Sequence, residues 1–167
     1  MILHDAELKK LIESDPPLVK DYISLEHQLQ PNGFDLTGHE VFRFKGAGEL
    51  DFSNKERVFP DTEPVTFDDM WAHLEPGVYK VKTNEYVHLP DDVTAFAQTR
   101  SSLLRMGAFT VHGFWDAGFH GKSEFSLVVQ NPHGLRFKQN ARIAQLMFIR
   151  LNDTVDEAYS GIHKGLE

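Results

Sequence analysis

The sequence contains no cysteine, which excludes disulfide bonds, cysteine-ligated zinc or iron–sulfur sites and thiol catalysis. It also lacks any apolar run close to the roughly 18 residues that a membrane-spanning helix needs. The opening residues, MILHDAELKK, do not show the basic and then apolar layout of a signal peptide. These absences predict a soluble cytoplasmic protein that makes no membrane contact.

Basic residues are scarce as well. Lys and Arg number 17 against 25 Asp and Glu, which gives a formal net charge of −8. Proteins that bind duplex nucleic acid usually present a basic surface, so nucleic acid is not expected as the main partner. A small anionic substrate would need a local arginine cluster, backbone N–H groups or a divalent cation.

The residues that are present fit one globular domain. The chain has 167 residues, of which 41% are hydrophobic and 25% are charged. Residues 5–12 have the pattern of a short N-terminal helix, with Asp5 as candidate N-cap and Pro16-Pro17 beyond its end. The following part changes to short β-type runs separated by Gly, Pro, Asn and Asp. Such a pattern is typical of an all-β sandwich or barrel.

The expected strands are short apolar or alternating runs between turn residues. They are residues 33–37, 40–45, 77–83, 86–88, 93–98, 109–114, 123–130, 135–137 and 144–151.

Other segments give weaker patterns. We expect a hairpin at residues 82–87, a turn at residues 89–92 and a short helix around residues 67–74, whereas residues 18–30 are ambiguous. The sequence therefore predicts a single β domain over residues 1–152. The polar residues 153–167 are expected to form a C-terminal arm that is mobile or ordered by a partner or ligand.

One stretch combines hydroxyl and guanidinium groups. Arg100, Ser101 and Ser102 are adjacent, and Arg105 follows in the same segment. If a helical turn starts here after a strand, its free N–H groups, the hydroxyls and the arginine charge would hold an anion. The alternative is that a serine merely caps the helix while the arginines form surface ion pairs.

A second stretch, GFWDAGFHG, places the carboxylate of Asp116 between aromatic residues with glycines on both sides. A carboxylate in such a turn can hold and deprotonate a water molecule. The aromatic ring of Phe119 can pack on a sugar or a base, and glycines allow close backbone approach. The alternative is a tight turn with a solvated Asp116 above core aromatics.

A third stretch, PNGFDL, places Asp35 after a glycine turn. A carboxylate there could hold a water molecule of hydrated Mg²⁺, although an ordinary Asx turn explains the same residues. The nine histidines show no metal-ligand spacing, and no Gly-x-Ser-x-Gly elbow is present. Neither a metal held by a cluster of protein ligands nor a serine triad is expected.

Four segments in this order resemble the dUTPase and dCTP deaminase superfamily: PNGFDLT, TRSSLLRMG, WDAGFHGK and ARIAQLMF. The start of the chain and the phrase TNEYVHLPDD are similar to the deaminase branch, particularly to its archaeal members. The tail AYSGIHKG is similar to the C-terminal segment of that branch but shorter. The resemblance implies a distorted β-barrel or jelly-roll-like fold, assembled as a homotrimer with active sites between subunits.

The resemblance also implies roles for single residues. Arg100, Ser101 and Ser102 would bind the triphosphate, Asp116 would activate water or hold the 3′-hydroxyl, and Phe119 would pack on deoxyribose. Three more positions complete this set: Asp35 as a water-mediated support for Mg²⁺, Gln145 near the phosphates, and Arg105 as the second arginine of the deaminase pattern.

One position departs from the deaminase pattern. The proton-shuttling glutamate of deaminases corresponds to Ser126, and the nearest carboxylate is that of Glu124. Two residues along a strand share a face but lie about 6.6 Å apart, which is too far for a proton relay unless a bulge shifts the register.

This departure favours hydrolysis of dUTP to dUMP and pyrophosphate over deamination. Two alternatives stay open: a dCTP deaminase, with or without the diphosphatase step, and a non-catalytic nucleotide-binding β domain.

Overall fold

Alternation along the strands makes one face of the sheet apolar and leaves the other to solvent. In the computed structural model, which describes residues 1–167, every second side chain of β9 (His120–Val129) is buried. The same alternation holds over most of β6 (Gly77–His88). The buried sides of the strands meet in one core that includes Phe34, Leu127 and Phe148.

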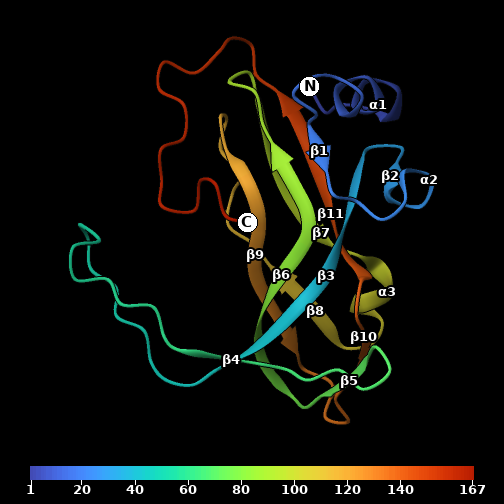
Figure 1. Cartoon of the computed structure of the whole chain (residues 1–167), viewed down its shortest axis with the longest axis vertical. Helices are drawn as coiled ribbons and strands as arrows, with labels where there is room; N and C mark the ends of the chain where they lie inside the picture. Colours follow the sequence, from blue (N-terminus) through green and yellow to red (C-terminus); the bar gives the residue numbers. More distant parts are fainter.

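The remaining elements complete a mainly β fold with a short N-terminal helix, as the sequence predicts. The other strands are β1 (Val19–Lys20), β2 (Leu29–Gln30), β3 (Gly33–Phe44), β4 (Thr62–Pro64), β5 (Trp71–Leu74), β7 (Val93–Thr99), β8 (Ala108–Val111), β10 (Leu135–Lys138) and β11 (Ala141–Arg150). The helices are α1 (Asp5–Ile12), α2 (Leu25–Gln28) and α3 (Ser101–Leu104) (Figure 1).

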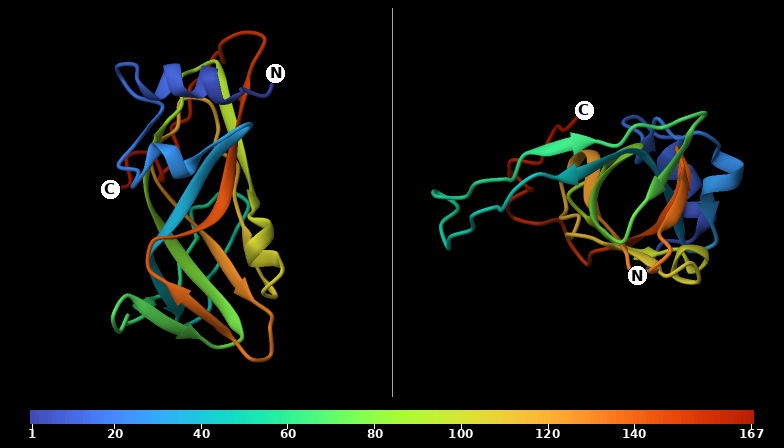
Figure 2. Two further views of the ribbon diagram at one scale, coloured as in Figure 1. Left: turned by 90° about the vertical axis from the view of Figure 1, so that its right-hand side faces the viewer. Right: turned by 90° about the horizontal axis from the view of Figure 1, so that it is seen from below.

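Nine strands form one sheet, whose central order is β7-β11-β3-β6-β9-β8. The two end strands come together and nearly close the sheet into a barrel, which Figure 2 shows end-on in its right-hand view. Thr110 N donates to Thr99 Oγ1 over 2.9 Å, and Ala95 forms an antiparallel bridge with Trp115. The expected barrel-like fold is confirmed.

The helix expected around residues 67–74 is wrong. Residues Trp71–Leu74 form β5 and pair with β10 in a separate two-stranded sheet. Asp69 and Met70 have positive φ angles of 44° and 66°. Such backbone conformations turn the chain and cannot continue a right-handed helix.

The hairpin expected at residues 82–87 is also wrong, because these residues all belong to one strand, β6. The register jumps from Lys82 opposite Glu124 to Tyr86 opposite Lys122. The residues between Lys82 and Tyr86 therefore bulge from β6. The polar Thr-Asn-Glu sequence marks this bulge rather than a turn.

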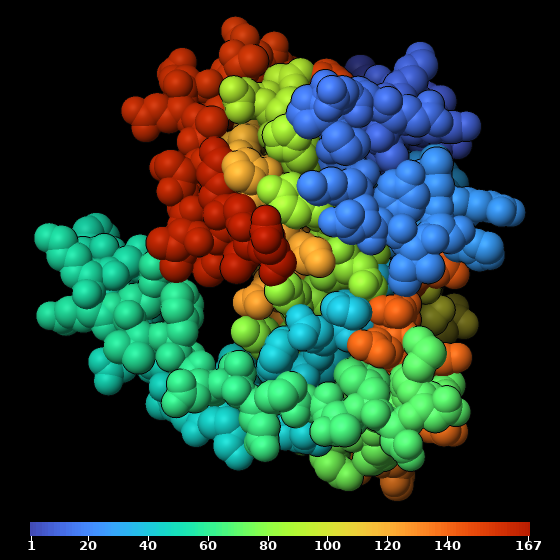
Figure 3. All heavy atoms as spheres, viewed as in Figure 1, coloured from blue at the N-terminus to red at the C-terminus, as the bar shows by residue number.

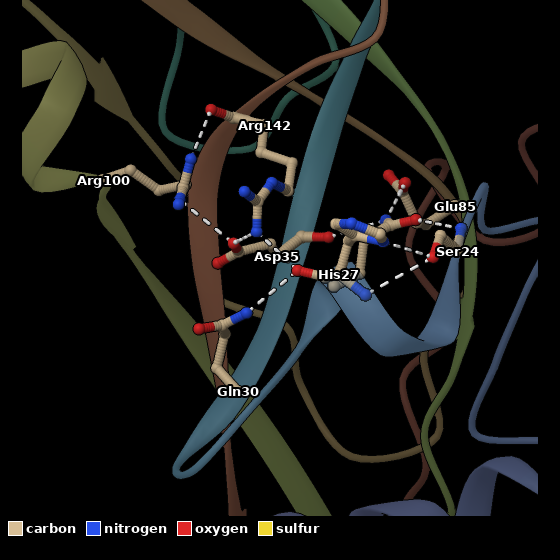
Figure 4. Close-up of polar contacts among 8 residues, drawn as sticks. Ser24, His27, Gln30, Asp35, Glu85, Arg100 and Arg142 are labelled. Carbon is tan, nitrogen blue, oxygen red and sulfur yellow. Dashed lines mark hydrogen bonds and ion pairs between the residues drawn. The ribbon is translucent and has the colours of Figure 1, made fainter.

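The bulge carries the carboxylate of Glu85 into the protein interior (Figure 4). Its Oε1 accepts from Gln28 Nε2 at 2.7 Å and from Thr37 Oγ1 at 2.6 Å, and its Oε2 accepts from Thr37 N at 2.9 Å. Burial raises the pKa of Glu85, while these donors oppose the rise. The carboxylate ties α2, β3 and β6 together.

His112 gives the fold a sensitivity to acid. Its ring lies 4.6 Å from that of Phe125 between centroids, and its Nε2 is buried without a hydrogen-bond partner. This burial lowers the pKa of His112 from 6.5 to about 4. Between pH 6.5 and about pH 4, His112 is protonated in the unfolded chain but neutral in the native state. The free energy of unfolding therefore falls as the pH drops through this range.

We expect His112→Phe to lose less stability than the native chain between about pH 7 and about pH 5, because the variant has no buried imidazole to protonate. Urea unfolding at the two pH values measures this difference. His133→Phe is the matched control, since His133 is exposed. Equal losses for the native chain and His112→Phe would contradict the assignment.

The C-terminal residues follow no regular secondary structure, yet they fold back on their own chain (Figure 1). Tyr159 N donates to Ala117 O at 3.0 Å, and Gly165 N donates to His120 O at 2.7 Å. Figure 3 shows this tail along one side of the molecule, with a hollow between it and the loop of residues 45–61. The tail thus approaches the start of β9.

None of the helices is both long enough and apolar enough to cross a membrane.

Candidate functional site

The first group of expected site residues gathers around α3. Arg100 directly follows β7 and is the N-cap of α3, which has no side-chain capping hydrogen bond. The hydroxyl groups of Ser101 and Ser102 are therefore not used for capping, and both residues are exposed, as is Arg105. The expected alternative in which a serine serves as the helix cap does not occur.

Arg100 is fixed by a buried carboxylate (Figure 4). Asp35 Oδ2 lies 3.0 Å from Arg100 Nε and 3.1 Å from Arg142 Nη1, and the Asp35 side chain is 1% exposed. Gln145 stands opposite Asp35 in the β3–β11 register. Burial raises the pKa of Asp35, while the two arginine charges oppose the rise. Asp35 orients the guanidinium groups of both arginines.

This geometry does not fit the expected role of Asp35 as a support for Mg²⁺. The one oxygen with partners already contacts two positive charges, and these would repel a divalent cation. The other oxygen, Oδ1, is buried without a partner. Nowhere in the chain do three or more His, Asp or Glu side chains cluster in a way that could hold a metal ion. Asp35 is better described as the residue that positions Arg100.

The second group lies at the loop between β8 and β9. Trp115 is buried and anchors this loop, since its Nε1 donates to Ser123 Oγ at 2.9 Å. The next residue, Asp116, is exposed. It lines a cavity of about 570 Å³ between the loop and the tail. The carboxylate of Asp116 is therefore free to contact a ligand or a water molecule.

Gly118 shapes the turn after Asp116. Its φ of +80° lies in the left-handed region, and a Cβ there would come within 2.6 Å of Ala158 Cβ. The tail can thus pack directly on the turn. Phe119 is buried at 7% exposure, and its ring lies 5.7 Å from that of Tyr159 between centroids. Tyr159 therefore covers the ring that was expected to meet a sugar.

A second cavity, of about 380 Å³, adjoins the first and shares Phe114 and Tyr159 with it. Glu124 and Ser126 both line the second cavity. They face the same side of β9, as predicted. The register shift lies in β6, opposite Ser123, so β9 keeps its alternation and Glu124 is not moved into the place of Ser126.

The two groups of residues do not meet within one chain. Ala95 exchanges backbone hydrogen bonds with Trp115, beside Asp116. Arg100 lies at the far end of the same strand, about 16 Å from Ala95 at about 3.3 Å per residue. Figure 1 accordingly shows α3 and the start of β9 at different levels of the barrel. The expected site residues therefore form two separate groups within one chain, one around α3 and one at the loop between β8 and β9.

The sequence profile of the dCTP deaminase-like family matches residues 2–151. The chain belongs to the dCTP deaminase-like family. The matched residues include both groups of expected site residues, and residues 152–167 lie beyond them.

Relatives of this dCTP deaminase-like chain support the assignment over nearly its whole length. A protein of Methanosarcina mazei named probable deoxyuridine 5′-triphosphate nucleotidohydrolase is 48% identical, covering 98% of this chain and 96% of the relative. A Methanocaldococcus jannaschii protein named deoxyuridine 5′-triphosphate nucleotidohydrolase is 39% identical, covering 84% of this chain and 89% of the relative.

A solved structure supports the fold of this family member. The 2′-deoxycytidine 5′-triphosphate deaminase of Agrobacterium tumefaciens superimposes with a TM-score of 0.67 at 24% identity, covering 88% of this chain and 47% of the other. At this identity the similarity shows the fold alone.

Two functional candidates in this dCTP deaminase-like chain were missed by the sequence analysis. Arg142 lies in the segment ARIAQLMF, three residues before Gln145. Its positive charge there could have indicated a second anion-binding arginine. No motif surrounds Lys80 in the sequence. Only the strand register shows that it lies opposite Ser126 and beside Glu124.

Proposed function

We propose that this protein is a dUTP diphosphatase, which hydrolyses dUTP to dUMP and pyrophosphate. The observation that carries the proposal is the exposed carboxylate of Asp116 in a cavity that adjoins a second one, which is lined by aromatic rings. A deaminase would need a free carboxylate at the position of Ser126, and the chain has a hydroxyl there. The relatives named for dUTP hydrolysis support the same choice.

The proposed chemistry is attack by water on the α-phosphorus. Asp116 accepts a proton from the water while the new P–O bond forms, and the bond from the α-phosphorus to the bridging oxygen breaks. Pyrophosphate leaves with the electron pair of that bond. Arg100, Ser101 and Ser102 would stabilise the phosphate charge by hydrogen bonds and by the guanidinium charge.

Mg²⁺ belongs to the proposal only as the counter-ion that the triphosphate itself brings. No protein ligand is assigned to it, because Asp35 is already neutralised by Arg100 and Arg142.

The split of the site supports a homotrimer with shared active sites. Asp116 of one chain and Arg100 of the same chain are too far apart to contact one α-phosphate and its neighbours. In the proposed trimer a second copy would bring its Arg100 to the Asp116 side, and cyclic symmetry would repeat that contact around a closed ring. The pyrimidine deoxynucleoside triphosphate would then lie between protomers.

The tail of residues 153–167 is proposed to act as an arm over this site. Tyr159 lies on Phe119, where the resemblance places deoxyribose. The ring of Tyr159 would move from Phe119 when the sugar enters, and it would then cover the bound nucleoside.

Incubation with dUTP and with dCTP, each with Mg²⁺, tests the proposed function. We expect pyrophosphate from dUTP and little or no ammonia from dCTP, because Ser126 has no carboxylate to shuttle protons. Pyrophosphate and ammonia are assayed separately. Ammonia released from dCTP as fast as pyrophosphate from dUTP would establish the deaminase instead, and nucleotide binding without either product would establish a non-catalytic domain.

A further inference from the structure

The aromatic cavity contains an ion pair beside Ser126. Lys80 Nζ lies 3.4 Å from Glu124 Oε1, and the two side chains are 28% and 29% exposed. Lys80 stands directly opposite Ser126 in the β6–β9 register. All three side chains line the cavity of about 380 Å³ that also contains Phe119 and Tyr159.

The position of the lysine is supported from a second strand. Lys80 Nζ lies 4.7 Å above the centroid of the Phe42 ring on β3, which is its neighbour in the β3–β6 register. A cation over an aromatic ring is held by the negative face of the ring. Lys80 therefore has two partners that keep its ammonium group at the cavity wall, Glu124 and Phe42.

The ion pair has a hydrogen-bonding polarity that cannot reverse. An ammonium group only donates, and an ionised carboxylate only accepts. The hydroxyl of Ser126 can do either by rotating, so it does not distinguish between ligands. The wall of the cavity thus offers a fixed donor next to a fixed acceptor.

This pattern matches one pyrimidine and opposes the other. Uracil presents the O4 acceptor next to the N3–H donor, whereas cytosine presents the N4 amino donor next to the N3 acceptor. Lys80 can donate to O4 of uracil while Glu124 accepts from N3–H. Against cytosine, the ammonium would face an amino group and the carboxylate would face a ring nitrogen, so both pairs would be repulsive.

We propose that the Lys80–Glu124 pair selects pyrimidines with a keto group at position 4 and a protonated N3, and rejects cytosine. The inference deepens the proposed function and rests on it, since it places the base of dUTP in the aromatic cavity. It also gives Glu124 a recognition role in place of a proton-transfer role.

Lys80→Met tests the proposal, because it removes the donor and keeps much of the aliphatic stem. We expect kcat/KM for dUTP to fall by about 10- to 100-fold, the value of one specific base contact, mainly through a higher KM. Since kcat/KM for dCTP should not fall, the dUTP to dCTP ratio should drop by the same factor. Lys80→Arg should restore part of the preference, because a guanidinium also only donates.

Lys9→Met is the matched control for this ratio. Lys9 also pairs with a glutamate, Glu13, at 3.9 Å, but neither residue lines the cavity. An unchanged ratio in Lys80→Met, or an equal drop in Lys9→Met, would overturn the proposal. Circular dichroism of the variants shows whether the fold is kept.

Calorimetric binding of dUMP and dCMP separates this inference from the proposed function. If the native protein hydrolyses no dUTP, the diphosphatase proposal fails. The selection by Lys80 is then judged by whether dUMP binds more tightly than dCMP and whether Lys80→Met abolishes that difference. Glu124→Gln should weaken the preference as well, because its amide can donate to N3 of cytosine. Equal binding of dUMP and dCMP to the native protein would refute the selection outright.

Discussion

Asp116→Asn is expected to lower kcat for dUTP hydrolysis by roughly a thousandfold, within the range found for loss of a general base. The amide keeps the size of the side chain but cannot take a proton from water. Because proton transfer contributes in the transition state, the affinity for the nucleotide should change little. Steady-state pyrophosphate release gives kcat, and calorimetry with a non-hydrolysable dUTP analogue gives the affinity.

The matched control for this prediction is Asp61→Asn. Asp61 is also exposed and lines neither cavity, although Phe59 of the same loop lines the second one. It should retain native turnover. Native turnover in Asp116→Asn would remove Asp116 from the mechanism, and a large loss in Asp61→Asn would show that exposed aspartates act through overall charge instead.

Arg100→Gln is expected to abolish most activity alone, and mixing it with Asp116→Asn should restore part of it. If each site takes Asp116 from one protomer and Arg100 from another, random mixed trimers regain about a quarter of the native sites. The two variants are unfolded together, refolded and assayed for pyrophosphate. Light scattering should give about 57 kDa, three times the 19.1 kDa of one chain.

The control mixture combines Asp116→Asn with the double variant Asp116→Asn/Arg100→Gln. No protomer in that mixture has a native Asp116, so no site can recover. Recovery confined to the first mixture also shows that Arg100→Gln folds and assembles, although it removes one partner of Asp35. A stable, fully active monomer would contradict both the trimer and the shared site.

Much of the fold, and the local setting of the candidate site residues, could be predicted from the sequence. Alternating apolar residues and turn residues placed most strands, and the proline pair lies beyond the end of α1 as expected, although the N-cap of α1 is His4 and not Asp5. These signals are local, since each depends on residues within one turn or one strand. The exposure of Asp116 between the buried Trp115 and Phe119 agrees with the alternative that the sequence left open, a solvated aspartate above core aromatics.

The incorrect predictions arose where long-range pairing overrides local preference. The Thr-Asn-Glu sequence has the polarity of a turn, but the donors of Gln28 and Thr37 satisfy Glu85 inside the barrel. Residues Trp71–Leu74 could form a helical turn alone, but the partner strand β10 makes them a strand.

The sequence by itself determined a cysteine-free, mainly β chain with four ordered motifs and therefore the family to which it belongs. Only the tertiary structure decided that Asp35 holds Arg100 and Arg142, that Lys80 meets Glu124, and that Arg100 and Asp116 lie apart within one chain. The physical reason is strand register. Arg142 and Asp35 are 107 positions apart, and the register of β3 and β11, with its shift between Arg142 and Ala144, decides which side chains meet.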